Sequence, residues 1–227
     1  MKLIEYSHFR NRTHVFDNRE HAGQILSKAL NVYKELDPIV FAVPLGGIPV
    51  SAKISKILNC PMHTTLVSRL PLPHRPLVGF GAVSITNEVV INKKLVETIN
   101  LKKEIISEVI ENTKKKLKKM HSLFGEIPPI NIKNKRILLV DDGINSGYTL
   151  LAAIKSIKRN SPKEIIIAVP TASEKGIKLL ESEIETFVCP NVRTGYFFSV
   201  LNAYKNWREL EEMDIIKYFD HHHRGKK

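Results

Sequence analysis

The chain has 227 residues, of which 43% are hydrophobic and 26% are charged, and its formal net charge is +12 at pH 7. These fractions exclude a disordered tail and are typical of a globular protein with one full-sized core, with or without a small subdomain. No stretch approaches the length needed to cross a bilayer, and residues 1–12 lack the apolar run of a secretory leader. We therefore expect a cytoplasmic protein with no membrane partner.

Hydrophobic periodicity predicts alternating helices and strands in the first half of the chain. A polar leader is followed by a helix over 19–36, a strand over 39–43, a helix over 48–58 and a strand over 62–67. The proline-rich stretch 69–76 is predicted to be a loop, because proline removes a backbone donor and fixes φ. A hairpin of strands 80–85 and 88–91 and a long helix over 95–123 are expected next.

The alternation continues through the second half of the chain. It predicts a strand over 137–140, a helix over 149–159, a strand over 164–169, a helix over 174–181, a strand over 186–189 and a mixed tail. Cys60 and Cys189 are isolated and form no metal-ligand spacing, so we expect both to be reduced core residues. The pattern predicts an α/β fold, with a mostly parallel, Rossmann-like sheet flanked by helices on both faces.

Two adjacent carboxylates, Asp141 and Asp142, follow the apolar strand 137–140 directly. A small polar loop then leads into the next helix, and this edge of an open α/β sheet is where ligands bind. The carboxylates can accept hydrogen bonds from vicinal ribose hydroxyls. The backbone N–H groups of residues 145–149, with the Ser146 and Thr149 hydroxyls, can surround a phosphate at the positive end of the helix. The order of these groups predicts a site for a sugar phosphate.

Other interpretations of this loop are possible. The same residue types make ordinary turns and helix caps, so a loop without a ligand is the main alternative. A nucleotide P-loop does not fit, because Gly143 and Gly147 have the wrong spacing and no lysine follows. A phosphoacceptor receiver domain does not fit either, because too little chain remains after Asp142.

The positive charge would attract any polyanion, including nucleic acid, an acidic membrane surface or a substrate with several phosphates. Much of it lies in residues 114–119 and in the tail 221–227, which we expect to be a frayed, basic end. No aromatic platform interrupts the first cluster, which favours a solvated helix face over an RNA-binding surface. Nucleic-acid binding is left open.

The segment Val140-Asp-Asp-Gly-Ile-Asn-Ser-Gly-Tyr-Thr149 resembles the phosphoribosyl pyrophosphate (PRPP) signature of type I phosphoribosyltransferases. Ile39-Val-Phe-Ala-Val-Pro-Leu-Gly-Gly-Ile-Pro-Val50 is similar to the pyrophosphate-binding loop of that family. The chain also resembles a group of proteins predicted to be phosphoribosyltransferases. Its matching motifs are Asp17-Asn-Arg-Glu-His-Ala-Gly23, Pro44-Leu-Gly-Gly-Ile-Pro-Val50, Gly81-Ala-Val83 and Val140-Asp-Asp-Gly143, so the resemblance covers nearly the whole chain.

The resemblance implies an enzyme of nucleotide metabolism, a glycosyltransferase that uses PRPP and Mg²⁺ to attach a phosphoribosyl group to a nitrogenous base and releases pyrophosphate. It implies that Asp141 and Asp142 act on the ribose and as metal ligands. The other substrate-binding residues implied are Leu45, Gly46, Gly47, Gly143, Asn145, Ser146, Gly147, Tyr148 and Thr149. Few protein ligands to Mg²⁺ are expected, because this ion prefers phosphate oxygens and water. A homodimer is also implied.

One position departs from the pattern of the related group, which has arginine where this chain has Leu45. A charge-assisted contact of this kind contributes about 1.5–3 kcal/mol, so its loss would slow a reaction by an order of magnitude or more. Arg69, at the end of the next strand, is predicted to supply the missing charge as a catalytic residue, with a surface ion pair as the alternative. His74 and Arg75 on the proline loop are further candidates.

In similar enzymes the terminal segments form a hood over the base. The resemblance therefore implies one domain over 1–220, with a core at about 37–190, an insertion at about 80–125 and a hood from 1–36 and 190–219. Residues 196–198 or Trp207 could stack on a flat ring, residues 169–173 could line the same pocket, and ordinary core packing is the alternative for the aromatic residues. The sequence does not identify the acceptor base.

A second function of a different class fits the same residues. A non-catalytic sensor of PRPP or of a nucleotide would keep Asp141, Asp142 and the phosphate loop over residues 145–149. It could also bind nucleic acid through its basic surface. Leu45 and the charge excess favour this alternative. RNA or DNA binding with strong salt dependence, without pyrophosphate release, would identify it.

Overall fold

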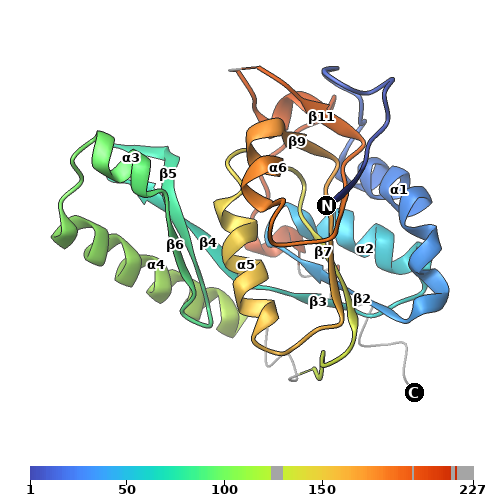
Figure 1. Ribbon diagram of the computed structural model, residues 1–227, viewed down its shortest axis with the longest axis horizontal. Helices are drawn as coiled ribbons and strands as arrows, with labels where there is room; N and C mark the ends of the chain where they lie inside the picture. Colours follow the sequence, from blue (N-terminus) through green and yellow to red (C-terminus); the bar gives the residue numbers. More distant parts are fainter. Residues whose placement is uncertain (124–129, 196, 216–217, 219–227) are drawn as a thin grey trace.

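The computed structural model describes residues 1–123, 130–195, 197–215 and 218. Its centre is a six-stranded sheet with the order β1-β10-β8-β7-β2-β3, in which every neighbouring pair is parallel (Figure 1). The strands are β1 (Lys2–Ile4), β2 (Pro38–Ala42), β3 (Met62–Thr64), β7 (Arg136–Val140), β8 (Glu164–Ala168) and β10 (Thr186–Val188). The expected parallel α/β sheet is confirmed.

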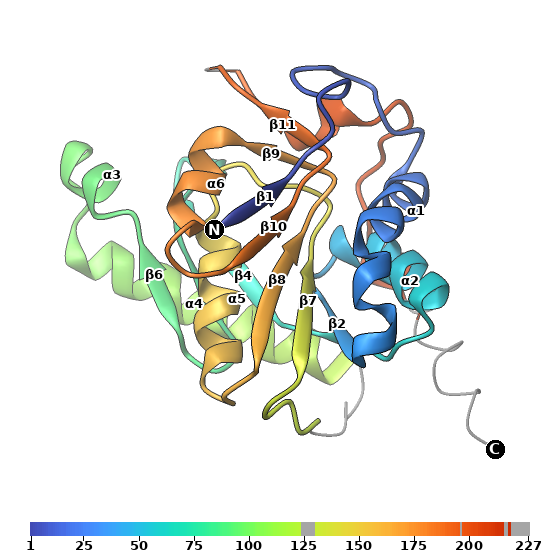
Figure 2. The same cartoon turned by 45° about the vertical axis from the view of Figure 1, so that its right-hand side comes forward.

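Helices cover both faces of this sheet (Figure 2). Helices α1 (Arg19–Leu30) and α2 (Gly47–Leu58) pack on one face, and α5 (Tyr148–Lys158) and α6 (Glu174–Leu180) pack on the other. The buried strands carry long apolar runs because they are covered on both faces. Alternate residues of β7 illustrate this, since Leu138 packs toward α1 and α2 while Leu139 packs toward α5.

A second, antiparallel sheet forms an arm that projects from the main body (Figure 1). It contains β4 (Val67–Leu72), β5 (Arg75–Ser84) and β6 (Val89–Ile91), followed by α3 (Lys93–Thr98) and α4 (Lys103–Leu123). The arm has its own small core, which includes Leu70, Phe80 and Leu117. Its first strand lies before residue 80, where the insertion was expected to begin.

The prediction of a loop over 69–76 holds only for the turn at 73–74, because β4 extends through Pro71 and β5 contains Pro76. Pro71 is on β4, which is an edge strand of this sheet. Proline is tolerated on an edge strand, because its missing N–H group can face solvent. Pro76 is on β5 between the paired residues Arg75 and Gly79, and it is opposite no residue of β4 or β6 in the described register. The register also shifts on both sides of Pro71, as expected where proline interrupts the ladder.

Two predicted helices are divided in the structure. The helix expected over 95–123 is split into α3 and α4, because Asn100 takes a left-handed conformation with a φ of 50°. The helix expected over 19–36 ends at Leu30 and continues as a 3₁₀ turn over Asn31–Leu36. Strand β1 was missed, since its three residues are mostly exposed and carry no alternating pattern.

The two terminal segments lie together above the carboxyl ends of the sheet strands. Phe16 forms an isolated bridge with Tyr204, and both side chains are buried with Ala22 and Ala203. Nearby, β9 (Thr171–Ser173) pairs with β11 (Asn191–Arg193), and η2 (Val200–Ala203) follows. The two terminal segments therefore contact each other, and their role as a hood over a base stays a prediction.

Asn191 fastens the amino-terminal segment to this region. Its side chain is fully buried, accepts a hydrogen bond from the Thr171 hydroxyl at 2.7 Å, and donates to the carbonyl oxygens of Phe9 and Arg12. A buried amide with several partners fixes the path of a segment that has few apolar contacts of its own.

In the part of the chain that the structure describes, no helix has the combination of length and apolar character required to span a bilayer. Cys189 is buried and Cys60 is half-buried, and neither forms a disulfide. Burial raises the pKa of the Cys60 thiol to about 11, which keeps it protonated and unreactive at neutral pH.

Candidate functional site

The acidic pair, Asp141 and Asp142, and the glycine loop, residues 44–47, meet at one edge of the sheet. Strands β2 and β7 are neighbours, with Ala42 opposite Val140, and both point their carboxyl ends in the same direction. Asp141 and Asp142 follow β7, while residues 44–47 follow β2. A hydrogen bond of 2.8 Å from the Val43 N–H to the Val140 carbonyl extends this pairing up to the loops. The adjacency of β2 and β7 therefore brings two segments that are far apart in the sequence into contact.

The glycine loop lies against the carboxylates. A Cβ atom at Gly46 would lie 2.0 Å from Asp142 Oδ2, and one at Gly47 would lie 2.7 Å from the Val140 carbonyl oxygen. Gly46 has a φ of −61° and a ψ of −35°, which any residue can adopt. Glycine is required there because of the close approach. The Pro44–Leu45 peptide bond of this loop is cis.

Arg19 is a site residue to which the sequence analysis gave no role. Its Nε donates to Asp142 Oδ2 at 2.8 Å, and its Nη1 donates to the Arg208 carbonyl oxygen at 2.9 Å. The guanidinium also lies 3.9 Å from the ring centroid of Trp207, and its side chain is only 9% exposed. The motif over residues 17–23 contains Arg19, but its partner is 123 residues away in the sequence, so only the fold reveals the contact.

The two carboxylates are in different electrostatic surroundings. Burial, reinforced by the charge of Asp142, raises the pKa of Asp141 well above its usual value. Burial also raises the pKa of Asp142, and the neighbouring Arg19 opposes that rise. Tyr204, whose own pKa is raised by burial, remains a donor and binds the Asp142 carbonyl oxygen at 2.6 Å. Asp142 is therefore held from both its side chain and its backbone, whereas no described cation forms an ion pair with Asp141.

This asymmetry predicts that Asp141 makes the protein less stable at neutral pH. An acid whose pKa is raised by folding contributes most at low pH, and stability falls as the pH rises from the ordinary value of 3.8 through the raised value. We expect Asp141→Asn to raise the free energy of unfolding by about 1 kcal/mol or more at about pH 8, with less gain at about pH 4. Urea denaturation of both proteins at the two pH values tests this, and an equal effect at both would contradict it.

The loop after the acidic pair is held by the small β9–β11 sheet. The Ile144 N–H donates to Thr171 O and the Ser173 N–H donates to Ile144 O, both at 2.9 Å, and the Ser173 hydroxyl donates to Asn145 O. Gly147 has a φ of 85° and begins helix α5. Among the described residues, the backbone N–H groups of residues 145–149 have no hydrogen-bond partner. They are the donors that an anion at the amino terminus of a helix requires.

The side chains of this loop differ in their exposure. Asn145 and Ser146 are exposed, Tyr148 and Thr149 are half-buried at the first turn of α5, and Gly143 and Gly147 leave space for neighbouring atoms. A Cβ at Gly143 would lie 2.6 Å from Val200, and one at Gly147 would lie 2.9 Å from the Gly176 carbonyl oxygen. The two glycines are therefore explained by packing, and the polar groups between them remain available to a ligand.

Leu45 has an apolar environment. It packs with Ile48 and Ala42 against Ile215 and Tyr218 of the carboxyl-terminal segment. Tyr218 in turn donates a hydrogen bond of 2.8 Å to Glu20 on α1. Leu45 thus joins the glycine loop to the carboxyl-terminal segment. The related group has a cation at the position of Leu45.

Arg69 is on β4 in the arm. Its Nη1 donates to the Leu77 carbonyl oxygen at 2.9 Å, and its aliphatic part crosses Gly79 on the neighbouring strand. Among the described residues it forms no ion pair with either carboxylate of the site. His74 and Arg75 are exposed at the tip of the same hairpin. The role predicted for Arg69 therefore remains a prediction, and its contacts in this structure are with the hairpin.

The aromatic candidates for base binding are separated by the fold. Trp207 covers Arg19 and lies 5.3 Å from the Tyr204 ring, while Phe197 is 97% exposed. Tyr196 is outside the described residues. Residues 169–173 are buried, and Thr171 and Ser173 form hydrogen bonds with residues 144–145 of the loop that follows the acidic pair.

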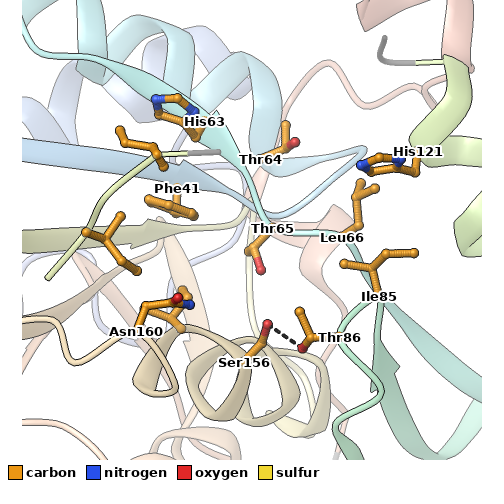
Figure 3. A pocket seen from close by; sticks show the side chains of 13 residues that line it. Phe41, His63, Thr64, Thr65, Leu66, Ile85, Thr86, His121, Ser156 and Asn160 are labelled. Carbon is orange, nitrogen blue, oxygen red and sulfur yellow. Dashed lines mark hydrogen bonds between the residues drawn. The ribbon is translucent and has the colours of Figure 1, made fainter. Parts of the chain in front are cut away.

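A cavity of about 290 Å³ lies elsewhere, between the arm, the end of α5 and strands β2 and β3 (Figure 3). Phe41, His63, Thr65 and Asn160 line parts of its wall. A hydrogen bond of 2.7 Å from the Thr86 hydroxyl to the Ser156 hydroxyl crosses from the arm to α5. None of the site residues predicted from the sequence lines this cavity, so it is separate from the acidic pair.

The parallel sheet brings two acidic side chains, a glycine loop and an open helix terminus to one edge, an arrangement suited to a phosphorylated ligand. Comparison with known families narrows the class of protein. The family model of the phosphoribosyl transferase domain matches residues 86–201, and the chain belongs to this family.

Three individual proteins are similar to this chain. Two proteins of Mycobacterium tuberculosis, from strains CDC 1551 / Oshkosh and H37Rv, are each 25% identical over 211 residues, and their names describe them provisionally as phosphoribosyl transferases. The match covers 92% of this chain and 47% of theirs, so the chain spans about half the length of these curated relatives. The crystal structure of TT1426 from Thermus thermophilus is 25% identical, with a TM-score of 0.70 over 89% of this chain and 96% of that one.

Proposed function

We propose that the protein binds PRPP with Mg²⁺ and transfers the phosphoribosyl group to a nitrogenous base, with release of pyrophosphate. The observation that carries this proposal is the close approach of the Gly46 backbone to the Asp142 carboxylate, beside a loop whose N–H groups have no hydrogen-bond partner among the described residues. Sites for a ribose, a 5-phosphate and a pyrophosphate would then be adjacent. Membership of the phosphoribosyl transferase domain family supports the same reaction class.

The residues would divide the substrate among them. Asp141 and Asp142 would accept hydrogen bonds from the ribose hydroxyls, residues 145–149 would bind the 5-phosphate, and the backbone of residues 45–47 would face the pyrophosphate. Departure of pyrophosphate leaves an oxocarbenium-like sugar, so stabilising the departing charge and excluding water are the main tasks of the protein. The base nitrogen then forms the new bond to the ribose.

Two carboxylates fit the limited protein ligation that Mg²⁺ requires when phosphate oxygens and water fill its other positions. Among the described residues, no group of three or more His, Cys, Asp or Glu side chains is placed to hold a metal ion. Asp141 is the more available ligand, because Asp142 is already paired with Arg19. When bound, Mg²⁺ would neutralise charge on the pyrophosphate.

The acceptor is proposed to be a flat nitrogenous base under the terminal segments. Of Phe197 and Trp207, Phe197 is the more available, since the Trp207 ring already covers Arg19. A homodimer and a cytoplasmic location remain parts of the proposal, and sedimentation in solution would test the first of them.

A pyrophosphate-release screen tests the proposed reaction. The protein is incubated with PRPP, Mg²⁺ and one of a series of purine, pyrimidine and pyridine bases. We expect release with one base or one class of bases, and loss of that release in the variant Asp141→Asn/Asp142→Asn. Release that is independent of the base, or unchanged in the variant, would contradict a transferase.

A PRPP sensor is the second candidate, and the environment of Leu45 favours it. An apolar cluster with Ile215 and Tyr218 replaces the cation that the related group has in this loop. A sensor would bind PRPP without releasing pyrophosphate in the presence of any base. If its basic surface binds RNA or DNA, the affinity should fall steeply with salt concentration.

A further inference from the structure

The glycine loop lacks its own cation, but a buried cation lies beside it. Asp142 Oδ2 is 2.8 Å from Arg19 Nε and would be 2.0 Å from a Cβ at Gly46, so the guanidinium and the loop contact the same oxygen atom. The loop is where the pyrophosphate of PRPP is proposed to bind. Among the described residues, Arg19 is therefore a buried cation that lies next to this loop.

From this placement we infer that Arg19 binds the pyrophosphate of PRPP and supplies the charge that Leu45 does not provide. The inference rests on the proposed function and adds a residue to it. The bond between the ribose C1 atom and the pyrophosphate oxygen breaks with its electron pair on that oxygen, and a guanidinium beside it stabilises the charge that develops.

The hydrogen bonds of Arg19 leave donors for this role. A guanidinium carries five N–H groups, of which one is used by Asp142 and one by the Arg208 carbonyl in the described part of the chain. The Trp207 ring, 3.9 Å away, covers a face of the group and leaves the N–H groups at its edge. An arginine held in this way loses little further conformational freedom when an anion binds.

Two other cations of the terminal segments are already paired with carboxylates. Lys205 pairs with Asp17 at 2.8 Å, and Arg208 pairs with Asp214 at 2.8 Å. In both pairs the side chains are more exposed than those of Arg19 and Asp142. A buried charge interacts more strongly with a bound anion, because less water screens it. This difference favours Arg19 as the residue that recognises the leaving group.

Separate titration of the two halves of PRPP tests the inference. Magnesium pyrophosphate and ribose 5-phosphate are each titrated by calorimetry into the wild type, Arg19→Lys and Arg19→Gln. We expect Arg19→Gln to weaken pyrophosphate binding by about 10- to 100-fold and to change ribose 5-phosphate binding far less, with Arg19→Lys between the two proteins. Arg136→Gln is the matched control, because Arg136 also uses its Nε to pair with a carboxylate, Glu164, but at the amino-terminal end of the strands.

Each other outcome would overturn the inference in a recognisable way. Equal weakening of both ligands would show that Arg19 acts only by positioning Asp142. Unchanged pyrophosphate binding would show that Arg19 is structural. Failure of both ligands to bind the wild type would reject the proposed function itself, and the inference with it.

A measurement on the wild type covers the case in which Arg19→Gln does not fold. Trp207 is the one tryptophan of the chain and lies against Arg19, so its fluorescence reports on that side chain. We expect magnesium pyrophosphate to change the Trp207 emission and ribose 5-phosphate to leave it nearly unchanged. No change at a saturating concentration of magnesium pyrophosphate would overturn the inference.

Discussion

Asp142→Ala is expected to lower the free energy of unfolding by about 3 kcal/mol, because it leaves the Arg19 charge buried without its carboxylate. The side chains of this ion pair are 9% and 14% exposed, so water can replace little of the lost contact. We also expect the variant to lose PRPP binding. Urea denaturation measures the first effect and calorimetry the second.

The more exposed ion pair between Arg136 and Glu164 provides the control for this prediction. Its side chains are 22% and 21% exposed, and its N–O distance is 3.4 Å, so Glu164→Ala should cost about 1 kcal/mol or less. In the double variant Arg19→Leu/Asp142→Ala, the loss should be smaller than the sum of the two single losses, because no unpaired charge remains. Additive losses, or a loss for Asp142→Ala no larger than for Glu164→Ala, would contradict the importance of the pair.

Gly46→Ala is expected to disrupt the site through one methyl group. The added Cβ would lie 2.0 Å from Asp142 Oδ2 and 2.4 Å from its Cγ, so the carboxylate or the loop must move. A displacement of about 1 Å at a reacting centre can lower a rate about 100-fold, and we expect pyrophosphate release to fall by about that factor. Overpacking should also lower stability by about 1–3 kcal/mol.

Gly195→Ala distinguishes this local effect from a general intolerance of alanine. A Cβ at Gly195 meets no atom within 4 Å, although its φ of 112° adds backbone strain. We expect that variant to lose some stability and to keep its PRPP affinity. If Gly46→Ala binds PRPP as tightly as Gly195→Ala does, the glycine loop is not part of the site.

The sequence predicted the parts of the fold that depend on local patterns. The apolar runs of β2, β7 and β8 are continuous because both faces of the sheet are covered, and the helices between them have a clear period. The acidic pair was predictable for the same reason, since it directly follows one of these strands. Strand β1 and the proline-containing ends of β4 and β5 depend on pairing partners, which a local pattern does not contain.

The parts of the candidate site that could not be predicted from the sequence are long-range contacts. Arg19 reaches Asp142 from the first turn of α1, and Leu45 reaches Ile215 near the other end of the chain. Neither contact has a signal in the spacing of nearby residues. The expected role of Arg69 came from its place after a predicted strand, and the structure gives that residue partners within the arm instead.

Calorimetric titration of PRPP with Mg²⁺ into the wild type and into Asp141→Asn/Asp142→Asn tests the central claim most directly. The acidic pair, the glycine loop and the phosphate loop are argued to form one PRPP site. We expect saturable binding to the wild type and loss of that binding in the variant, with both proteins folded. Absence of binding in the wild type, or equal binding in the two proteins, would contradict the account.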